Sequence, residues 1–156
     1  LRFACYAHDW GKANDGMQKV LTGTGEQSIR HEHLSTIMLA QPSIWNVLPS
    51  IPNLDREIML SAVLCHHLKA TEKEGDNSFG VVRGKIKDIQ LLHGNGDFQK
   101  ILQEIRKTFQ IDKFNLEMPA RISFRDNDQH DVRELAKKVR NNIFSKLKNA
   151  LSGASE

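Results

Sequence analysis

The sequence lacks several features that would assign it to a class at once. Its two cysteines, Cys5 and Cys65, are too few for a disulfide framework, so a reducing cytosol is the expected compartment. No apolar run approaches the roughly 20 residues needed to cross a bilayer, and no basic segment followed by an apolar stretch indicates a signal peptide. We therefore expect a cytoplasmic protein that makes no membrane contact.

Aromatic residues and net charge are also modest. Aromatics make up 6% of the chain, and the formal charge is +3 with a pI near 8.9. This mildly basic balance allows nucleic acid as a partner without requiring it. At 156 residues the chain is expected to form one domain, 1–156. It has no initiator Met and starts inside an apolar run, so we interpret it as a fragment or as incomplete at the N-terminus.

Aliphatic residues, by contrast, are plentiful, and many recur at the spacing of an amphipathic helix. The segment 55–68 is apolar nearly all round, which is typical of a buried central helix. No convincing multi-strand pattern is present, and we therefore predict an all-α fold. Helices are predicted over residues 1–8, 17–21, 29–40, 55–68, 97–109 and 131–151, with a further helix from Pro119 that carries Ile122.

Smaller signals predict how these helices are joined. Gly11 can end the first helix in a left-handed conformation, and Asp15-Gly16 marks a turn. The polar, glycine-punctuated residues 69–97 predict a loop-rich excursion after the helix that ends near residue 68. The inner face of the helix over 97–109 is predicted to hold Phe98, Ile101, Leu102, Ile105 and Phe109.

The most informative stretch lies near the start, where His8 and Asp9 stand side by side. A neighbouring imidazole nitrogen and carboxylate oxygen can both reach one divalent cation, and such mixed ligands suit Zn, Fe, Mn, Co or Ni. Alone the pair is a weak signal, because His-Asp occurs often by chance. Three histidines downstream support it: His31, and then the adjacent His66 and His67.

The later histidines differ in what their positions predict. His31 lies on the apolar face of its predicted helix and is taken as a ligand, with a packed core histidine as the alternative. His33 points away, so it either supports the ligands from outside or lies at the surface. His66 and His67 close the last turn of an apolar helix, where buried imidazoles need partners. They could reach two neighbouring metals, or one metal and the substrate; otherwise one is packed and the other exposed.

Basic residues provide candidate contacts to an anionic substrate. Arg83, Lys85 and Lys87 could line a phosphodiester path, although a merely solvated loop is the simpler interpretation. Lys69 is a further candidate for substrate binding. The helix predicted over 131–151 carries Lys and Arg on its outer side. These charges indicate either a solvated face or a surface for nucleic acid or protein.

Three blocks of the sequence carry a resemblance to a known family. They are Ala7-His8-Asp9-Trp10-Gly11-Lys12-Ala13-Asn14-Asp15-Gly16-Met17-Gln18, Ile29-Arg30-His31-Glu32-His33-Leu34-Ser35 and Cys65-His66-His67-Leu68-Lys69-Ala70. Together they resemble the HD nuclease domain of the CRISPR type I nuclease-helicase, whose pattern is His-Asp and Lys, then Arg-His-Glu and Ser, then His-His. The match spans residues 7–70. Residues 71–156 match weakly, apart from the region Asp126–Asp128.

The resemblance implies an HD-domain helical bundle and a role for each matching residue. It makes His8 and Asp9 metal ligands, with Asp9 able to bridge two ions. Lys12 is implied to lie beside the scissile phosphate and to neutralise its charge. The second metal is implied to be held by His31, His66 and His67. An aspartate on a later helix completes the family's set, and either Asp128 or Asp126 is the candidate here.

One family ligand has no counterpart in its usual place. The family has a histidine upstream of the His-Asp pair, and no histidine precedes His8 here. Either this ligand lies in missing N-terminal residues, or the domain is circularly permuted and His130 supplies it. If neither holds, the protein binds one ion or is inactive.

The implied activity is metal-dependent hydrolysis of single-stranded DNA, as an endonuclease in CRISPR interference and antiviral defence. The expected cofactor is a divalent metal, two ions of Mn, Ni, Fe, Co or Mg, which activate water for attack on the phosphodiester. The expected partners are a helicase domain or subunit and an RNA-guided surveillance complex. Two alternatives remain open: an HD phosphohydrolase acting on nucleotides or cyclic nucleotides, and a degenerate HD domain that serves as a docking module.

Overall fold

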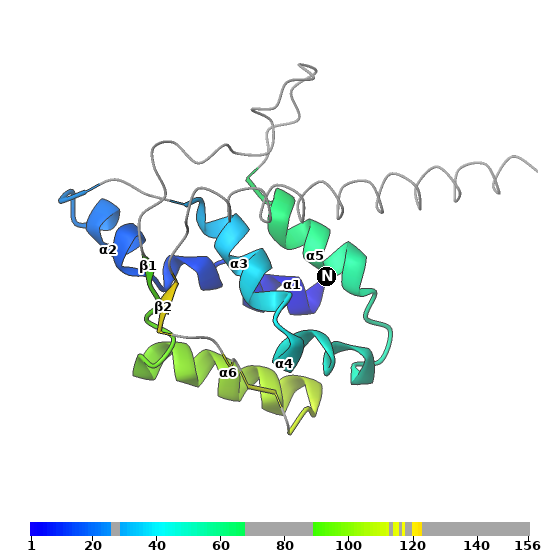
Figure 1. Cartoon of the computed structure of the whole chain (residues 1–156). Coiled ribbons are helices and arrows are strands. Elements are labelled where there is room, and N and C mark those ends of the chain that lie inside the picture. The colour runs from blue at the N-terminus through cyan, green and yellow to red at the C-terminus, as the bar shows by residue number, and fades with distance from the viewer. Residues whose placement is uncertain (26–28, 68–88, 113, 116, 118–119, 123–156) are drawn as a thin grey trace, which may run out of the picture.

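The computed structural model describes residues 1–25, 29–67, 89–112, 114–115, 117 and 120–122 (Figure 1). Within these residues the chain is mostly helical, which confirms the prediction of a helical fold at that level. The helices are α1 (Arg2–Ala7), η1 (Trp10–Lys12), α2 (Asp15–Leu21), α3 (His31–Leu39), α4 (Pro42–Trp45), η2 (Leu48–Ser50), α5 (Arg56–Cys65) and α6 (Gly96–Phe109). The strands are β1 (Ile89–Gln90) and β2 (Arg121–Ile122).

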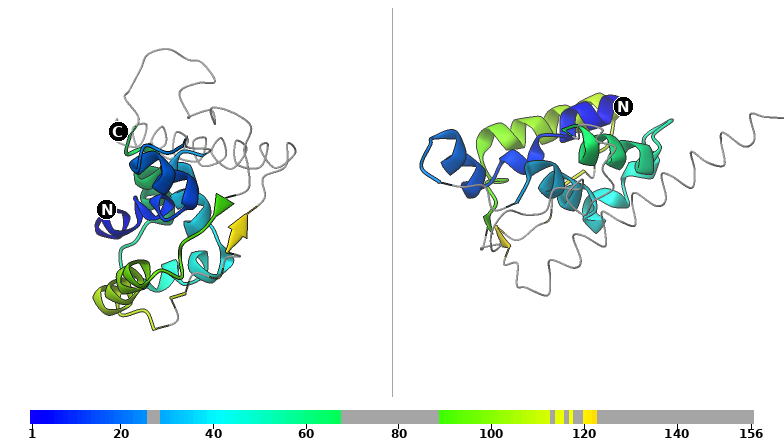
Figure 2. Two further views of the ribbon diagram at one scale, coloured as in Figure 1. Left: turned by 90° about the vertical axis from the view of Figure 1, so that its left-hand side faces the viewer. Right: turned by 90° about the horizontal axis from the view of Figure 1, so that it is seen from above.

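Helix α3 is the centre of the arrangement. It packs against η1 on one side and against α5 on another, while α1 contacts both α5 and α6. Figures 1 and 2 show α6 running along one edge of the molecule, with α2 and the two short strands gathered at one end. This packing brings residues from the start of the chain, from α3 and from the end of α5 into one neighbourhood.

Side-chain caps fix where three of these helices begin. The Asn14 side chain accepts a hydrogen bond from the backbone N–H of Met17 at 2.9 Å, which starts α2. Asp55 caps α5 through the N–H of Ile58 at 3.0 Å. Asn95 caps α6 in the same way. Because Asn14 starts α2, Asp15 lies in its first turn, and the predicted turn at Asp15-Gly16 is wrong.

The core combines aliphatic side chains with a chain of aromatic rings. Trp10 of η1 packs against Phe98 of α6 and against Phe114, with ring centroids 5.8 and 5.9 Å apart. Phe3 of α1 reaches the same Phe114 at 5.8 Å. Such tilted and edge-on contacts add to the energy of apolar burial. They tie η1, and therefore the neighbouring His8-Asp9 pair, to the main core.

Two predictions about apolar faces are wrong at single positions. Ile101 is 40% exposed, while Phe98, Leu102 and Ile105 of α6 are buried as predicted. Ile58 on α5 is 55% exposed, so this helix is not buried on every side. Helical periodicity identifies the apolar face, but not how far the neighbouring elements extend over it.

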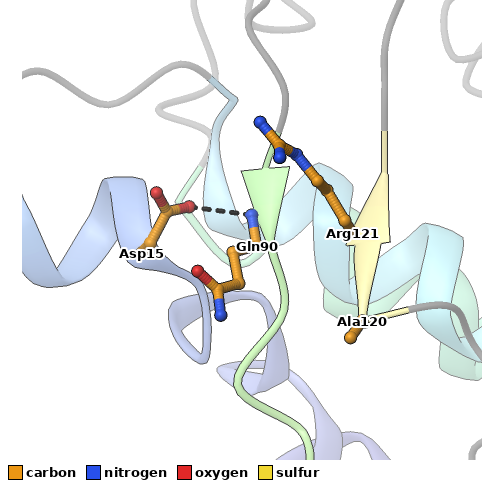
Figure 3. Close-up of a pocket in the computed structure, with 4 residues that line it drawn as sticks. All are labelled: Asp15, Gln90, Ala120 and Arg121. Carbon is orange, nitrogen blue, oxygen red and sulfur yellow. Dashed lines mark hydrogen bonds between the residues drawn. The ribbon is translucent and has the colours of Figure 1, made fainter.

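The two strands form a small antiparallel ribbon in which Ile89 pairs with Ile122. The helix predicted to carry Ile122 is therefore wrong, because tertiary pairing overrides local propensity here. The N–H of Gln90 donates to Asp15 Oδ1 at 2.9 Å, which fastens the ribbon to α2. A pocket of about 300 Å³ lies beside them. Figure 3 shows the residues that line it, Asp15, Gln90, Ala120 and Arg121. It contains none of the predicted site residues.

Several predictions fall outside the described residues. These are the helix over 131–151, most of the excursion over 69–97, and the candidate site residues Lys69, Arg83, Asp126, Asp128 and His130. In the described part of the chain, no helix has the length and apolar character required to traverse a bilayer.

Candidate metal centre

The site depends on a close contact between η1 and α3. A Cβ added to Gly11 would lie 1.9 Å from the backbone oxygen of His31, so only glycine fits. Glycine is needed here for close approach and not for a left-handed turn, because among the described glycines only Gly23 has a positive φ. The prediction of a left-handed Gly11 is therefore wrong.

Ser35 of α3 fixes the same contact from the other side. Its buried hydroxyl accepts a hydrogen bond from the N–H of Gly11 at 2.7 Å and donates to the carbonyl oxygen of His8 at 2.8 Å. These two bonds hold the backbone on both sides of Asp9 against α3. The side chain of Asp9 is thereby held beside His31.

Four of the predicted ligands come together. Asp9, His31, His66 and His67 each offer one ligand atom, and these atoms all lie within 4.8 Å of one another. Nε2 of His31 is at the middle, 3.3 Å from Nε2 of His66, 3.1 Å from Nε2 of His67 and 3.4 Å from Oδ1 of Asp9. The four residues could hold a metal ion.

The end of α5 determines how the two adjacent histidines converge. The helix ends at Cys65, so His66 and His67 follow its last turn and do not close it as predicted. His66 is mostly buried, whereas His67 is exposed. This burial agrees with the alternative in which one ring is packed and the other exposed, but both rings reach His31.

Hydrogen bonds set which ring nitrogen faces the cluster. Nδ1 of His66 lies 2.6 Å from the carbonyl oxygen of Val63, which can only accept, so Nδ1 carries the proton and Nε2 keeps a lone pair. On α3, the buried Glu32 carboxylate lies 3.5 Å from Nδ1 of His31 and favours the same tautomer there. Two nitrogen lone pairs therefore point toward each other and toward Asp9.

Asp9 Oδ1 adds a third acceptor to this group. The atom is buried and has no hydrogen-bond partner, and it lies 3.4 Å from Nε2 of His31 and 3.8 Å from Nε2 of His66. A buried acceptor that faces only other acceptors is costly unless a cation or a proton lies between them. This convergence of lone pairs is the arrangement that a metal ion would satisfy.

The electrostatics keep the ligands in the required protonation states. Burial lowers the pKa of His31 from 6.5 to about 4, so the ring is neutral at physiological pH. Burial acts to raise the pKa of Asp9, but the hydrogen bond from Lys12 and the nearby charges outweigh it, so this pKa is lowered. A neutral imidazole and an ionised carboxylate are the forms that bind metal.

His8 and Lys12 lie on the other side of Asp9. Nε2 of His8 is 3.3 Å from Asp9 Oδ2, and Nζ of Lys12 is 2.9 Å from the same oxygen. His8 is not one of the four residues whose ligand atoms cluster together. Its ring centroid is 5.0 Å from that of His66, so it borders the cluster.

Three residues that matter for this geometry received no role in the metal site from the sequence. Glu32 faces His31, Ser35 joins the two elements, and Gly11 permits their contact. His33 is 6% exposed, which excludes the surface position considered for it. The sequence signal for Glu32 and Ser35 is their place within the block Ile29–Ser35.

The donor set limits which metals fit. Three imidazoles and one carboxylate favour divalent ions such as Zn, Fe, Co, Ni and Mn over Mg, which prefers oxygen ligands. Comparisons of this chain with protein-family models, with curated proteins and with solved structures found no match.

Proposed function

We propose that this chain is a metal-dependent phosphodiesterase of the HD type, a nuclease that hydrolyses single-stranded DNA. The observation that supports it most is the convergence of Asp9, His31, His66 and His67, with Lys12 against the same aspartate. The HD-type helical bundle is part of this proposal, as are the helicase and the RNA-guided complex of CRISPR interference as partners. These follow from the resemblance over residues 7–70.

The ligands would hold a divalent ion through Asp9 Oδ1 and the Nε2 atoms of the three histidines. Such an ion polarises a phosphoryl oxygen and makes water a better nucleophile at neutral pH. The carbonyl of Val63 holds the proton of His66 on Nδ1, away from the ligand position. Glu32 does the same for His31.

Lys12 gives the site its second feature, a cation next to the ligand cluster. Its ammonium is hydrogen-bonded to Asp9 at 2.9 Å, and its side chain is 39% exposed. A phosphate that enters from solvent could therefore contact it. The ammonium would neutralise charge on the scissile phosphate while Asp9 keeps it in place.

The proposal is tested by a nuclease assay on metal-reconstituted protein. Wild type, Asp9→Asn and Asp15→Asn are each loaded with Mn²⁺, Co²⁺ or Ni²⁺ and incubated with single-stranded DNA. Asp15 is the matched control, because it also pairs with a lysine, Lys19, at 3.2 Å but lies outside the cluster. We expect cleavage by wild type and Asp15→Asn, and a loss of at least about 100-fold in Asp9→Asn.

The same assay separates this function from its rivals. Release of phosphate from a nucleotide or cyclic-nucleotide panel, without DNA cleavage, would replace the nuclease with a nucleotide phosphohydrolase. Equal cleavage by wild type and Asp9→Asn would refute the metal mechanism. If the protein holds no metal and His66→Ala folds as wild type does, the docking module is the better interpretation.

A further inference from the structure

The carboxylate of Asp9 divides the site into two unequal halves. Its Oδ1 atom faces His31 and His66 and has no hydrogen-bond partner. Its Oδ2 atom faces His8 and accepts a hydrogen bond from Lys12. One oxygen therefore lacks a cation, and the other already has one.

The half around Oδ2 has the beginnings of a second metal site. Nδ1 of His8 lies 2.8 Å from the carbonyl oxygen of Cys5, which can only accept, so the neutral ring carries its proton on Nδ1. Its Nε2 then keeps a lone pair, 3.3 Å from the carboxylate oxygen of Asp9. Two acceptors at this separation repel each other unless a positive group lies close by.

Lys12 supplies that positive group. Its ammonium lies 2.9 Å from Asp9 Oδ2, the same oxygen that lies 3.3 Å from Nε2 of His8. Among the described residues, His8 is the one other ligand candidate on this side, against three imidazoles on the Oδ1 side. A second divalent ion would have to displace the ammonium and would also be repelled by the first ion.

We propose that the Lys12 ammonium stands in for a second metal ion at Asp9 Oδ2, so that the wild-type chain binds one ion tightly and not two. This inference rests on the proposed metal centre. It assigns His8 to a second metal site at Asp9 Oδ2, which stays without a metal ion while the Lys12 ammonium occupies it. Removal of the ammonium opens this site, and His8 then becomes a ligand.

Electron paramagnetic resonance of the Mn²⁺-loaded protein, with elemental analysis of metal per chain, tests this directly. We expect about one ion and the spectrum of an isolated Mn²⁺ in wild type. Lys12→Met should bind about two ions and give the spectrum of a spin-coupled pair. The double variant His8→Ala/Lys12→Met should return to about one isolated ion.

Lys19→Met is the matched control, because Lys19 forms a similar pair with Asp15. It should leave both metal content and spectrum unchanged. Lys12→Gln provides a second version of the change, and thermal unfolding verifies that each variant folds. Exposed pairs of this kind contribute little to stability, so folding should be retained.

The outcomes separate this inference from the function on which it rests. Two coupled ions in wild type, or one isolated ion in both Lys12 variants, would overturn the stand-in role and leave the metal centre in place. A wild-type chain that binds no Mn²⁺, Co²⁺ or Ni²⁺ would remove the centre itself. One ion without DNA cleavage would contradict the nuclease and not the role of Lys12.

Discussion

Two aspartate–lysine pairs lie close together in the chain, and they have different surroundings. Asp15 accepts from Lys19 through one oxygen and from the backbone N–H of Gln90 through the other, so protein donors satisfy both atoms. Asp9 accepts from Lys12 through one oxygen, while the other faces imidazole nitrogens and has no donor. Asp15 of the first pair joins α2 to β1. Asp9 of the second pair has a buried oxygen without a hydrogen-bond donor, which a cation could neutralise.

The difference arises from what packs behind each carboxylate. Behind Asp15 lies β1, and the backbone N–H of Gln90 in this strand donates a hydrogen bond to the carboxylate. Behind Asp9 lies α3, which Gly11 and Ser35 hold so close that Nε2 of His31 is 3.4 Å from Asp9 Oδ1. The lesson is that a charged pair indicates function only when the atoms beyond it are known.

The largest effect is expected from breaking the contact that places Asp9. Gly11→Ala puts a methyl group onto the backbone oxygen of His31, and we expect the free energy of unfolding to fall by about 3 kcal/mol. Urea denaturation measures it. Gly94→Ala is the control, because nothing lies within 4 Å of a Cβ built there. Equal stability of the two variants would contradict the close contact.

Ser35→Ala tests the same contact more gently. The change leaves the N–H of Gly11 and the carbonyl of His8 without their partner, and we expect a loss of about 2 kcal/mol in unfolding free energy. Ser50→Ala, which removes an exposed hydroxyl bonded to Val47, should change stability by less than about 0.5 kcal/mol. Metal affinity should fall in Ser35→Ala alone; unchanged affinity would separate the contact from the site.

Glu32→Gln sharpens the comparison by altering the support of one ligand. The carboxylate charge next to Nδ1 of His31 is removed, and we expect metal affinity to fall about 10-fold. Isothermal titration with Co²⁺ measures this, and Glu104→Gln, a change on α6 away from the cluster, is the control. If Glu32→Gln binds Co²⁺ as tightly as wild type does, the charge of Glu32 does not support His31 as a ligand.

A separate effect is expected from pH on the metal-free protein. The pKa of His31 is lowered by burial from 6.5 to about 4, so the unfolded chain takes up this proton at a higher pH than the folded one does. Stability should therefore decline as pH falls from about 6.5 toward 4. His31→Gln, which cannot titrate, should show a shallower decline in urea denaturation across this range. Parallel curves would contradict the buried, neutral ring.

The sequence was sufficient to select the residues that cluster but not to predict how they are arranged. His31, His66, His67 and Asp9 were predicted from their types and order, and the structure brings them together. The sequence predicts His8 as a ligand beside Asp9, and the structure places its ring at the other oxygen of Asp9, with Nε2 3.3 Å from Oδ2.

The fold shows the same division. Periodic apolar residues located most of the described helices, because burial of one face follows directly from spacing. The strand at Ile122 was missed, since its pairing with Ile89 depends on a distant segment. Gly11 was misinterpreted for a similar reason. Local sequence suggests a turn, whereas the close contact with His31 requires a residue without a side chain.

The most direct test of the central claim is Co²⁺ binding, followed by its visible absorption, in wild type, Asp9→Asn and Asp15→Asn. We expect wild type and Asp15→Asn to bind Co²⁺ with the absorption of a histidine-rich site. Asp9→Asn should bind at least about 100-fold more weakly. Equal binding by Asp9→Asn and wild type would contradict the metal centre.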